Sequence, residues 1–479
     1  MLHIPILRRG RPYRSVEVVG AVHHRTKAPL AEYSQANPGL IRKDILGLGD
    51  AAARLGACSS AELLDVCARA AGFFGEAELP LGDSTQSVQD YVEQTSATTG
   101  LPWVMVRRNL EKIRGVMANM AGVLRGLTRN LDLEILDRGF GETEGFVVSY
   151  YRRARSLGVV MPSNSPGVHS LWAPAFALKT PLVLKPGSAE PWTPYRMIQA
   201  FLCAGAPPEA FGYYPTDHAG SGEILRHCDR GMVFGDVSST RVWAGDPRVE
   251  VHGPGWSKIV VGEDLIDEWP RFLDVMVTSI LENSGRSCVN ASGVWVPRHA
   301  APIAEALAEK LAKVVPLDAA DPEAQIAPFA DAGVASRTNA LVEHGLAEPG
   351  ARDVTAAYRG GGRLVVWQDC SYLLPTIILC DSPCHPLANK EYLFPFASVV
   401  EAPEHSLPDV LGPTLVLTAI SANRRLQQRL LGSPLIGRLN FGAIPTNRIV
   451  WDQPHEGNLF DHLYARRAFQ AMPEPAMAG

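Results

Sequence analysis

Cys288 closes a short polar stretch, Asn-Ser-Gly-Arg-Ser-Cys at residues 283–288, that runs directly into an apolar segment. A thiolate can attack an aldehyde or thioester carbonyl, and the covalent intermediate splits one difficult displacement into two easier steps. A cysteine in a loop with apolar flanks is also often an inert, buried small hydrophobe. The local sequence therefore leaves two interpretations open, a catalytic nucleophile or a core residue.

Four further polar stretches punctuate apolar segments at positions where the strands of an α/β sheet would end. They are residues 161–167 (MPSNSPG), 184–191 (LKPGSAEP), 251–258 (VHGPGWSK) and 389–396 (NKEYLFPF). Open α/β sheets bind ligands at the carboxyl ends of their strands, so we expect these stretches to meet at one site. Taken singly, each has an ordinary structural interpretation, because asparagine and glycine are common turn residues.

The overall composition excludes several classes of function. The 479 residues carry 45 Lys and Arg against 50 Asp and Glu, a net charge of −5 that predicts neither a nucleic-acid nor a membrane-surface partner. No segment approaches the ~20 apolar residues of a membrane span, and the first residues lack the charge order of a secretory signal. Eight scattered cysteines fit free thiols in a reducing compartment, so we expect a cytoplasmic protein.

One cysteine cluster has a spacing like that of metal ligands. Cys380, Cys384 and His385 lie close together in the sequence. A structural zinc needs four ligands, and no partner for this cluster is evident in the sequence. We therefore predict no metal site.

The hydrophobic periodicity changes near residue 140. From about residue 40 to 135, apolar residues recur at i, i+3 and i+4, which predicts helices. From about 144 to 435, short apolar runs ended by Gly, Pro or Asp alternate with helical stretches, which is typical of parallel βαβ units. The pattern predicts a doubly wound α/β architecture repeated in two halves.

The order of the polar stretches is more informative than any of them alone. An asparagine between prolines is followed by Lys-Pro, a Gly-Pro-Gly turn, Asn-x-Gly-x-x-Cys and Lys-Glu-x-x-x-Pro. This succession resembles the aldehyde dehydrogenase superfamily over about residues 145–460. The resemblance implies an aldehyde-dehydrogenase-like α/β fold with two doubly wound Rossmann-type domains, a β-arm for oligomerisation and a helical N-terminal region.

The resemblance also implies domain boundaries. We expect an N-terminal helical region packed on the cofactor domain, a nucleotide-binding domain with an arm at 145–156, a catalytic domain carrying Cys288, and a C-terminal return segment with an oligomerisation arm. Their ranges are 1–140, 141–256, 257–435 and 436–479. Segment 145–156 and the stretch 443–458 are the expected arm segments of a homodimer or homotetramer.

Two residues match the family's catalytic groups. Cys288 matches the nucleophile, and Asn164 matches the side chain that forms the oxyanion hole together with the backbone N–H of the cysteine. Arg286, two residues before the cysteine, has two interpretations. It either stabilises the thiolate or grips a substrate anion, or else it simply points to solvent.

Five residues match or adjoin the family's cofactor contacts. Lys185 matches a residue at the adenosine ribose, Glu391 matches a residue at the nicotinamide ribose, and Pro162 and Phe394 lie beside such contacts. Ser188 replaces the glutamate that NAD-preferring relatives commonly carry. A hydroxyl can donate to a 2′-phosphate that a carboxylate would repel, so NADPH/NADP is the expected cofactor, with NAD possible as well.

His252 is the main departure from the family. It stands where ordinary members carry the glutamate base that activates water for the second, hydrolytic step. The Gly-Pro-Gly that follows is similar to the CoA-acylating branch, and residues 90–113 and 232–264 look like the acyl-CoA reductase of bacterial bioluminescence. The resemblance then implies NAD(P)H-dependent reduction of an acyl-CoA, or another acyl thioester, to an aldehyde through a Cys288 acyl-enzyme.

Two alternatives stay open. An NAD(P)-dependent aldehyde dehydrogenase could oxidise an aldehyde to a carboxylic acid, with His252 or Glu250 replacing the glutamate base. A non-catalytic homologue is the third interpretation. For the enzyme, the expected partners are an acyl-CoA or aldehyde substrate and an acyl-transferring protein, with an apolar channel or core packing for four aromatic residues: Trp172, Phe176, Trp295 and Phe441.

Overall fold

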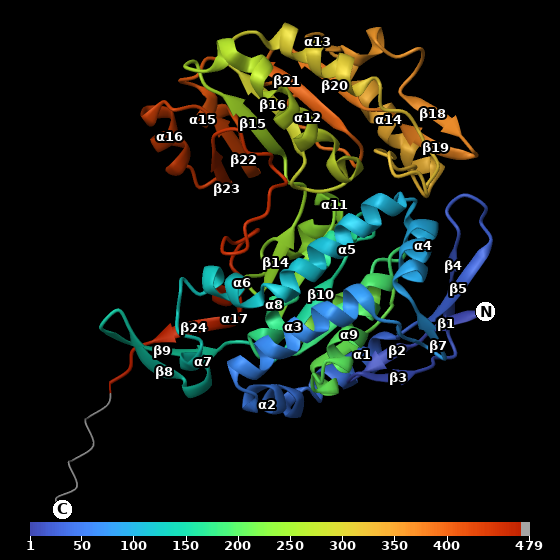
Figure 1. The fold of residues 1–479 in the computed structure, drawn as a ribbon, viewed down its shortest axis with the longest axis vertical. Helices are drawn as coiled ribbons and strands as arrows, with labels where there is room; N and C mark the ends of the chain where they lie inside the picture. Colours follow the sequence, from blue (N-terminus) through green and yellow to red (C-terminus); the bar gives the residue numbers. More distant parts are fainter. Residues whose placement is uncertain (471–479) are drawn as a thin grey trace, which may run out of the picture.

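Two seven-stranded sheets organise the computed structural model, one in each lobe of the molecule (Figure 1). The structure describes residues 1–470, so the last nine residues of the expected C-terminal arm lie outside it. Within residues 1–470, no helix is both long enough and apolar enough to cross a bilayer.

The first sheet has the strand order β14-β13-β10-β11-β12-β2-β3, and β10 to β14 are parallel. Its strands are β2 (Ile6–Arg8), β3 (Arg11–Tyr13), β10 (Leu157–Val160), β11 (Leu182–Lys185), β12 (Phe211–Tyr213), β13 (Arg230–Phe234) and β14 (Val249–His252). The chain leaves β10 in one direction through β11 and β12, and then returns to the other side of β10 for β13 and β14. This reversal is a topological switch point, where doubly wound sheets open a ligand crevice.

Helices cover both faces of this sheet. Those within the repeat are α8 (Pro174–Ala177), α9 (Trp192–Cys203), α10 (His218–His227) and α11 (Val237–Thr240). The N-terminal region adds α1 (Pro38–Leu46), α2 (Gly49–Ala57), α3 (Ser60–Glu76), α4 (Val88–Thr99), α5 (Trp103–Ala118), α6 (Met120–Leu127) and α7 (Glu134–Arg138). The helices predicted between about 40 and 135 are therefore present, interrupted by the hairpin β6 (Leu79–Leu81) and β7 (Ser84–Gln86).

The first 34 residues form strands where helix was expected. Beside β2 and β3 they supply a three-stranded sheet of β1 (Leu2–Ile4), β4 (Val18–Val22) and β5 (Pro29–Ser34). Pro5, Pro12 and Pro29 remove backbone donors that a helix would need, and the valines of β4 favour extended structure.

The second sheet has the order β17-β20-β21-β16-β15-β22-β23, parallel except at its β17 edge. Its strands are β15 (Ser257–Val261), β16 (Ala291–Val296), β17 (Ala351–Asp353), β20 (Thr376–Cys380), β21 (Phe396–Glu401), β22 (Thr414–Ile420) and β23 (Ile436–Phe441). Every residue of β15, β16 and β22 is buried. Such burial is expected of parallel strands covered on both faces.

Five helices and a side hairpin accompany the second sheet. They are α12 (Leu273–Leu281), α13 (Ala300–Leu311), α14 (Ala332–Leu346), α15 (Leu407–Val410) and α16 (Arg424–Leu431), with the hairpin β18 (Leu364–Trp367) and β19 (Cys370–Leu373).

A small three-stranded sheet projects from the first lobe, at the lower left of Figure 1. It has the order β24-β9-β8, from β8 (Phe140–Thr143), β9 (Phe146–Arg152) and β24 (Tyr464–Arg467), with α17 (Leu459–Leu463) just before β24. Segment 145–156 thus supplies its central strand. The expectation for 443–458 is wrong, because that stretch forms no strand and runs as coil between the lobes (Figure 1). Pro445 and Pro454 lack the N–H that strand pairing requires.

Candidate active site

The five polar stretches meet between the lobes, but not all at strand ends as expected. Residues 161–167 and 184–191 follow β10 and β11. The Cys288 stretch and residues 389–396 instead precede β16 and β21. The carboxyl edge of the first sheet therefore faces the amino edge of the second, and the site forms where these two edges meet.

The loop that carries Cys288 has an unusual backbone. Asn283, Ser284 and Gly285 take positive φ angles of 52°, 58° and 64°. Non-glycine residues in this region cost on the order of 1–3 kcal/mol each and persist only when the surroundings hold them. The holding contacts are hydrogen bonds from Asn109 Nδ2 to Asn283 Oδ1 at 2.8 Å and from the Ala327 N–H to Ser284 Oγ at 2.9 Å.

The Gly-Pro-Gly turn fixes the position of Cys288 from the other side. A Cβ on Gly255 would lie 2.0 Å from the carbonyl oxygen of Cys288, so only glycine allows this approach. The same oxygen accepts a hydrogen bond from Ser257 Oγ at 2.8 Å. The turn and the cysteine loop therefore form one packed unit.

Two cavities meet at Cys288. A cavity of about 600 Å³, termed here the cofactor cavity, lies between the lobes. It is lined by Cys288, Asn164 and His252, among other residues. A second cavity of about 500 Å³, termed the substrate cavity, is lined by α5 and the coil at 445–455. Three residues besides Cys288 line both, namely Val168, Phe234 and Ser287.

The expected cofactor contacts divide between the cofactor cavity and its surroundings. Pro162, Ser188 and Glu391 line it. Lys185 lies at the end of β11, outside the lining, with its pKa lowered by burial. Phe394 also lies outside, buried in the core of the second lobe, while its neighbour Leu393 faces the cavity.

Asn164 has one of its amide hydrogens engaged. Its Nδ2 donates to the carbonyl oxygen of Arg286 at 2.7 Å, and its buried Oδ1 has no hydrogen-bond partner among the described residues. The amide group carries two N–H bonds, so one remains for a ligand oxygen.

The Cys288 thiol is disfavoured as a thiolate in the absence of ligands. Burial raises its pKa above the ordinary range, and the carboxylates of Glu456 and Glu391 add to the rise, whereas Lys112 opposes it. Ionisation of this thiol therefore needs a group that accepts its proton. The pKa of Glu391 is raised to about 7 by burial, although its Oε2 accepts a hydrogen bond from the Trp256 N–H at 2.7 Å.

His252 is held between two carboxylates and is buried. Its Nδ1 lies 2.7 Å from Glu456 Oε2, its Nε2 lies 3.8 Å from Glu250 Oε2, and its ring stacks on Phe234. Burial alone would lower its pKa, but the two carboxylates outweigh burial and raise the pKa to about 9. The two carboxylates therefore favour the protonated imidazole at neutral pH.

Arg286 does not face solvent. Its side chain is buried, donating to the backbone carbonyl oxygens of Thr99 and Pro328 and stacking on Phe329. The interpretation as a solvated charge is therefore wrong, whereas a role toward the thiolate or a ligand stays a prediction, since Arg286 lines the cofactor cavity. The two accepting carbonyl oxygens belong to the end of α4 and to the second lobe. The guanidinium therefore links α4 to the second lobe beneath the cysteine loop.

The four aromatic residues considered for a channel do not line the substrate cavity. Trp172, Phe176 and Trp295 are fully buried in the cores, and Phe441 packs against the core of the second lobe. The aromatic lining comes from Phe234 and Trp451 instead.

Sequence reasoning missed two charged residues of the site, Lys112 and Glu456. Lys112 lies on α5 and lines the substrate cavity, and Glu456 lies in the coil that was expected to be an arm. No local motif marks either residue. Their charge would have predicted a place in the site only if the path of the coil had been known.

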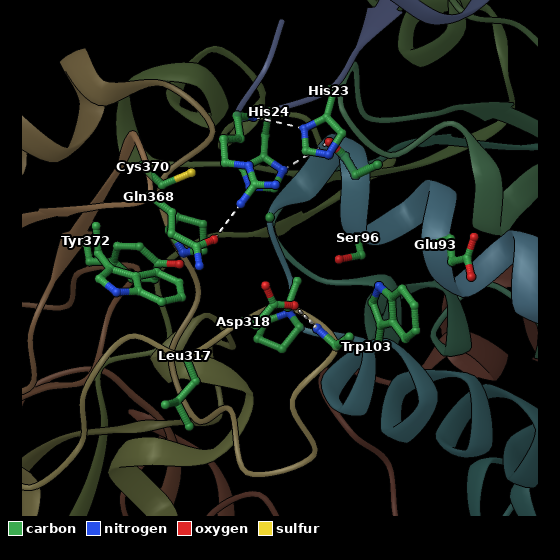
Figure 2. A pocket seen from close by; sticks show the side chains of 18 of the residues that line it. His23, His24, Glu93, Ser96, Trp103, Leu317, Asp318, Gln368, Cys370 and Tyr372 are labelled. Carbon is green, nitrogen blue, oxygen red and sulfur yellow. Dashed lines mark hydrogen bonds between the residues drawn. The ribbon is translucent and has the colours of Figure 1, made fainter. Parts of the chain in front are cut away.

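A third cavity of about 400 Å³ lies away from Cys288, between the loop that joins β4 to β5, the end of α4 and the hairpin β18–β19 (Figure 2). His23 and His24 stack at 4.9 Å on one side, and burial lowers the pKa of both. None of the residues predicted for the site lines this cavity.

Cys288 lies on a strained loop between two Rossmann-type sheets, half-buried and with a cavity on each side. This arrangement defines a class of two-lobed α/β proteins with a thiol at their domain interface. Residues 85–406 match the aldehyde dehydrogenase family. The chain belongs to that family.

The chain shares low sequence identity with individual relatives. The chain is 27% identical over 256 residues to geranial dehydrogenase of Castellaniella defragrans, a match that covers 51% of each chain. The match thus spans about half the length of this relative. Among solved structures, an indole-3-acetaldehyde dehydrogenase bound to NAD⁺ gives a TM-score of 0.78 at 16% identity, covering 98% of this chain and 96% of the other. A 3,6-anhydro-L-galactose dehydrogenase bound to NADP gives 0.76 at 14%, covering 98% and 99%. These structural likenesses show the fold.

Gly255→Ala is expected to displace Cys288. The added methyl group meets the Cys288 carbonyl, and such overpacking destabilises a protein by about 1–3 kcal/mol. The checks are the thermal midpoint and the rate at which iodoacetamide alkylates Cys288. Gly253→Ala in the same turn is the control, because a Cβ there meets nothing within 4 Å. Equal midpoints for the two variants would contradict the close approach.

His252 is expected to make stability depend on alkaline pH. Its folded pKa of about 9 exceeds the unfolded value of 6.5, so its contribution is present below pH 6.5 and lost as the pH rises through 9. The loss is on the order of 3 kcal/mol. Urea denaturation across this range should show it for the wild type and much less for His252→Gln. His344→Gln, at an exposed site, is the control, and a flat wild-type profile would exclude the buried imidazolium.

Proposed function

We propose that this protein is an NAD(P)-dependent aldehyde dehydrogenase with Cys288 as its nucleophile. The observation that carries the proposal is the position of this thiol, on a loop held from both lobes and at the junction of two cavities. The named relative is a dehydrogenase of an aldehyde, which supports oxidation of the same kind of group.

The cofactor cavity fits a nicotinamide dinucleotide in position and size. It opens at the switch point of the first sheet and extends past Ser188 and Glu391 to Cys288. Ser188 and Glu391 would hold the two riboses, and Pro162 would support the chain between them. A bound nicotinamide would accept the hydride that leaves the substrate carbon.

Two features bear on which dinucleotide is used. Ser188 presents no carboxylate against a 2′-phosphate, which supports use of NADP as well as NAD. Asp236 caps the first turn of α11 through its Oδ1, which accepts from the Ser239 N–H at 2.8 Å. This carboxylate occupies donors that could otherwise bind a pyrophosphate, so we expect phosphate contacts to come from elsewhere.

The protein groups then act in turn, and Glu391 serves twice, as a ribose contact and as a proton acceptor. Cys288 Sγ forms a bond to the carbonyl carbon, while the thiol proton leaves to Glu391, whose pKa of about 7 suits an acceptor at neutral pH. The free N–H of Asn164 and the Cys288 backbone N–H donate to the oxyanion that develops. Once the hydride has left, an acyl thioester remains on the sulfur.

Water discharges this thioester in the proposed dehydrogenase. His252 holds its proton below pH 9 and so does not serve as the base at neutral pH. The carboxylates of Glu250 and Glu456 flank it, and we assign the proton of the attacking water to this pair.

One observation favours a second candidate, NAD(P)H-dependent reduction of an acyl-CoA or of an acyl group delivered by a partner protein. An imidazolium in the position of the usual carboxylate is suited to protonating a leaving thiolate, and an activated water would destroy the thioester before reduction. The two candidates share Cys288 and Asn164 and differ in what discharges the thioester.

Steady-state assays separate these candidates. We expect purified protein to reduce NAD⁺ or NADP⁺ with an aldehyde in the absence of CoA, and Cys288→Ala to lower that rate on the order of a thousandfold or more. Cys384→Ala, at an exposed thiol, is the matched control. Absorbance at 340 nm and free thiol release report the two directions. Activity only with CoA, or NADPH oxidation with stoichiometric thiol release from an acyl-CoA, would instead establish the thioester reductase.

The projecting sheet supports a homodimer or homotetramer. On β9, Phe146 is 70% exposed and Val147 is 55% exposed, so each face of this strand carries an exposed apolar side chain. Exposed apolar side chains that gather on a projecting element commonly mark interfaces.

Charge on β9 is expected to break the oligomer. Phe146→Asp with Val147→Asp should convert the protein to a monomer, because an interface cannot bury unpaired carboxylates cheaply. Light scattering coupled to size exclusion measures the mass. Val242→Asp, at a residue that is also exposed but lies elsewhere, should leave the mass unchanged. A monomeric wild type would refute this assembly.

A further inference from the structure

The substrate cavity carries an excess of positive charge. Arg108, Lys112 and Arg448 line it, against a single carboxylate, Glu282. Glu282 lies 3.6 Å from Arg108, which leaves the other two cations without a charge partner. Within residues 1–470, neither the Lys112 ammonium nor the Arg448 guanidinium forms an ion pair or a side-chain hydrogen bond.

Lys112 is placed inside the cavity by a neighbouring glycine. A Cβ on Gly167 would lie 3.4 Å from Lys112 Cδ and 3.5 Å from its Nζ, so the lysine side chain lies along the backbone of this glycine. Burial lowers the pKa of Lys112, and the charge of a Cys288 thiolate opposes this fall. An ammonium that is partly desolvated and unpaired is costly unless a ligand supplies the counter-charge.

The unpaired positive charge lies on this side of Cys288. The cofactor cavity contains three carboxylates, those of Asp236, Asp331 and Glu391, against two cations. Arg286 is engaged with backbone carbonyl oxygens, and the His252 imidazolium lies between two carboxylates of its own. The field across the site therefore draws an anionic group toward the substrate cavity.

The walls of the substrate cavity also have a large apolar part. It includes Val168, Leu171, Phe234, Ile449 and Trp451. A carbon chain that joined a carbonyl at Cys288 to an anion at Lys112 and Arg448 would have these side chains to pack against.

We propose that the substrate is an aldehyde that carries a carboxylate at the far end of a short carbon chain, bound by Lys112 and Arg448. This proposal rests on the proposed aldehyde oxidation at Cys288. Lys112 and Arg448 are binding residues for the carboxylate and take no part in the chemical steps.

The kinetic test compares 4-oxobutanoate with its methyl ester, which keeps the chain and removes the charge. Wild-type kcat/KM should favour the acid. In Lys112→Met and Arg448→Gln, kcat/KM for the acid should fall about tenfold or more through KM, since each variant loses a charge-assisted hydrogen bond to the carboxylate. The ester should be unaffected. Lys43→Met, at an exposed lysine of α1, is the control.

A second test needs no cofactor and no turnover. Iodoacetate and iodoacetamide alkylate a thiolate by the same reaction and differ in charge, so the ratio of their rates at Cys288 is independent of the thiol pKa. Lys112→Met should lower this ratio about fivefold or more by removing one positive charge. The exposed thiols Cys203 and Cys384 in the same sample are internal controls, resolved by peptide mass spectrometry.

The outcomes distinguish this proposal from the proposed aldehyde oxidation on which it rests. Suppose that wild-type protein oxidises the acid and the ester equally, and that Lys112→Met leaves the ratio of the two alkylation rates unchanged. The proposed substrate class is then wrong, and the proposed aldehyde oxidation is unaffected. Equal losses with both alkylating agents and both aldehydes would make Lys112 a stabiliser of the thiolate, which also overturns the proposed substrate class. Discrimination between acid and ester that is lost when CoA is present would assign the cations to CoA phosphates, and this also overturns the proposal. Failure to oxidise any aldehyde, with the ratio still dependent on Lys112, contradicts the proposed function alone.

Discussion

The turn at residues 253–256 is the constraint on which the site depends. It carries the chain from the end of β14 in one lobe to the start of β15 in the other, and it touches both the nucleophile and Glu391. Trp256 takes a φ of 44°, its N–H binds Glu391, and its carbonyl accepts from the buried ammonium of Lys258 at 2.7 Å. Burial lowers the pKa of Lys258 to about 7. A change in the angle between the lobes would therefore move the thiol and the cavity walls together.

Electrostatics divides the site into two halves around the thiol. Carboxylates dominate on the side of the first sheet's switch point, and cations dominate on the side of α5 and the coil at 445–455. Both halves act on Cys288, since Glu391 and Glu456 raise its pKa while Lys112 lowers it. Occupation of either cavity by a charged ligand would therefore change the reactivity of the thiol. In the absence of ligands, burial and the two carboxylates together disfavour the Cys288 thiolate.

Much of this architecture could be predicted from the sequence. The alternation of strands and helices predicted two doubly wound halves. The order of the polar stretches predicted that four residues share one site, namely Asn164, His252, Cys288 and Glu391. Where prediction failed, the cause is tertiary. Lys112 lies on a helix and Glu456 lies in a coil. The local sequence around each residue predicts that secondary structure and nothing about the site. They reach the site because the chain returns across the gap between the lobes, and no periodicity encodes that path.

The same limit explains Arg286. Its position next to the cysteine suggested a ligand or a solvated charge, yet the guanidinium turns inward and binds carbonyl oxygens contributed by segments more than forty and more than one hundred and eighty residues away. A buried cation without a carboxylate is tolerated only when several dipoles converge on it. Such convergence is a property of the assembled lobes.

The two carboxylates beside His252 decide what proton chemistry this ring can perform. A carboxylate at this position would be a base at neutral pH, whereas an imidazole between Glu250 and Glu456 is an acid with a pKa of about 9. His252 therefore supplies a proton donor, and the two carboxylates keep it charged. In the proposed dehydrogenase, the water that discharges the thioester would give its proton to those carboxylates, so hydrolysis would depend on Glu456 and the coil that carries it. The rate of that step is then tied to the ordering of residues 445–458, the same coil that closes the substrate cavity.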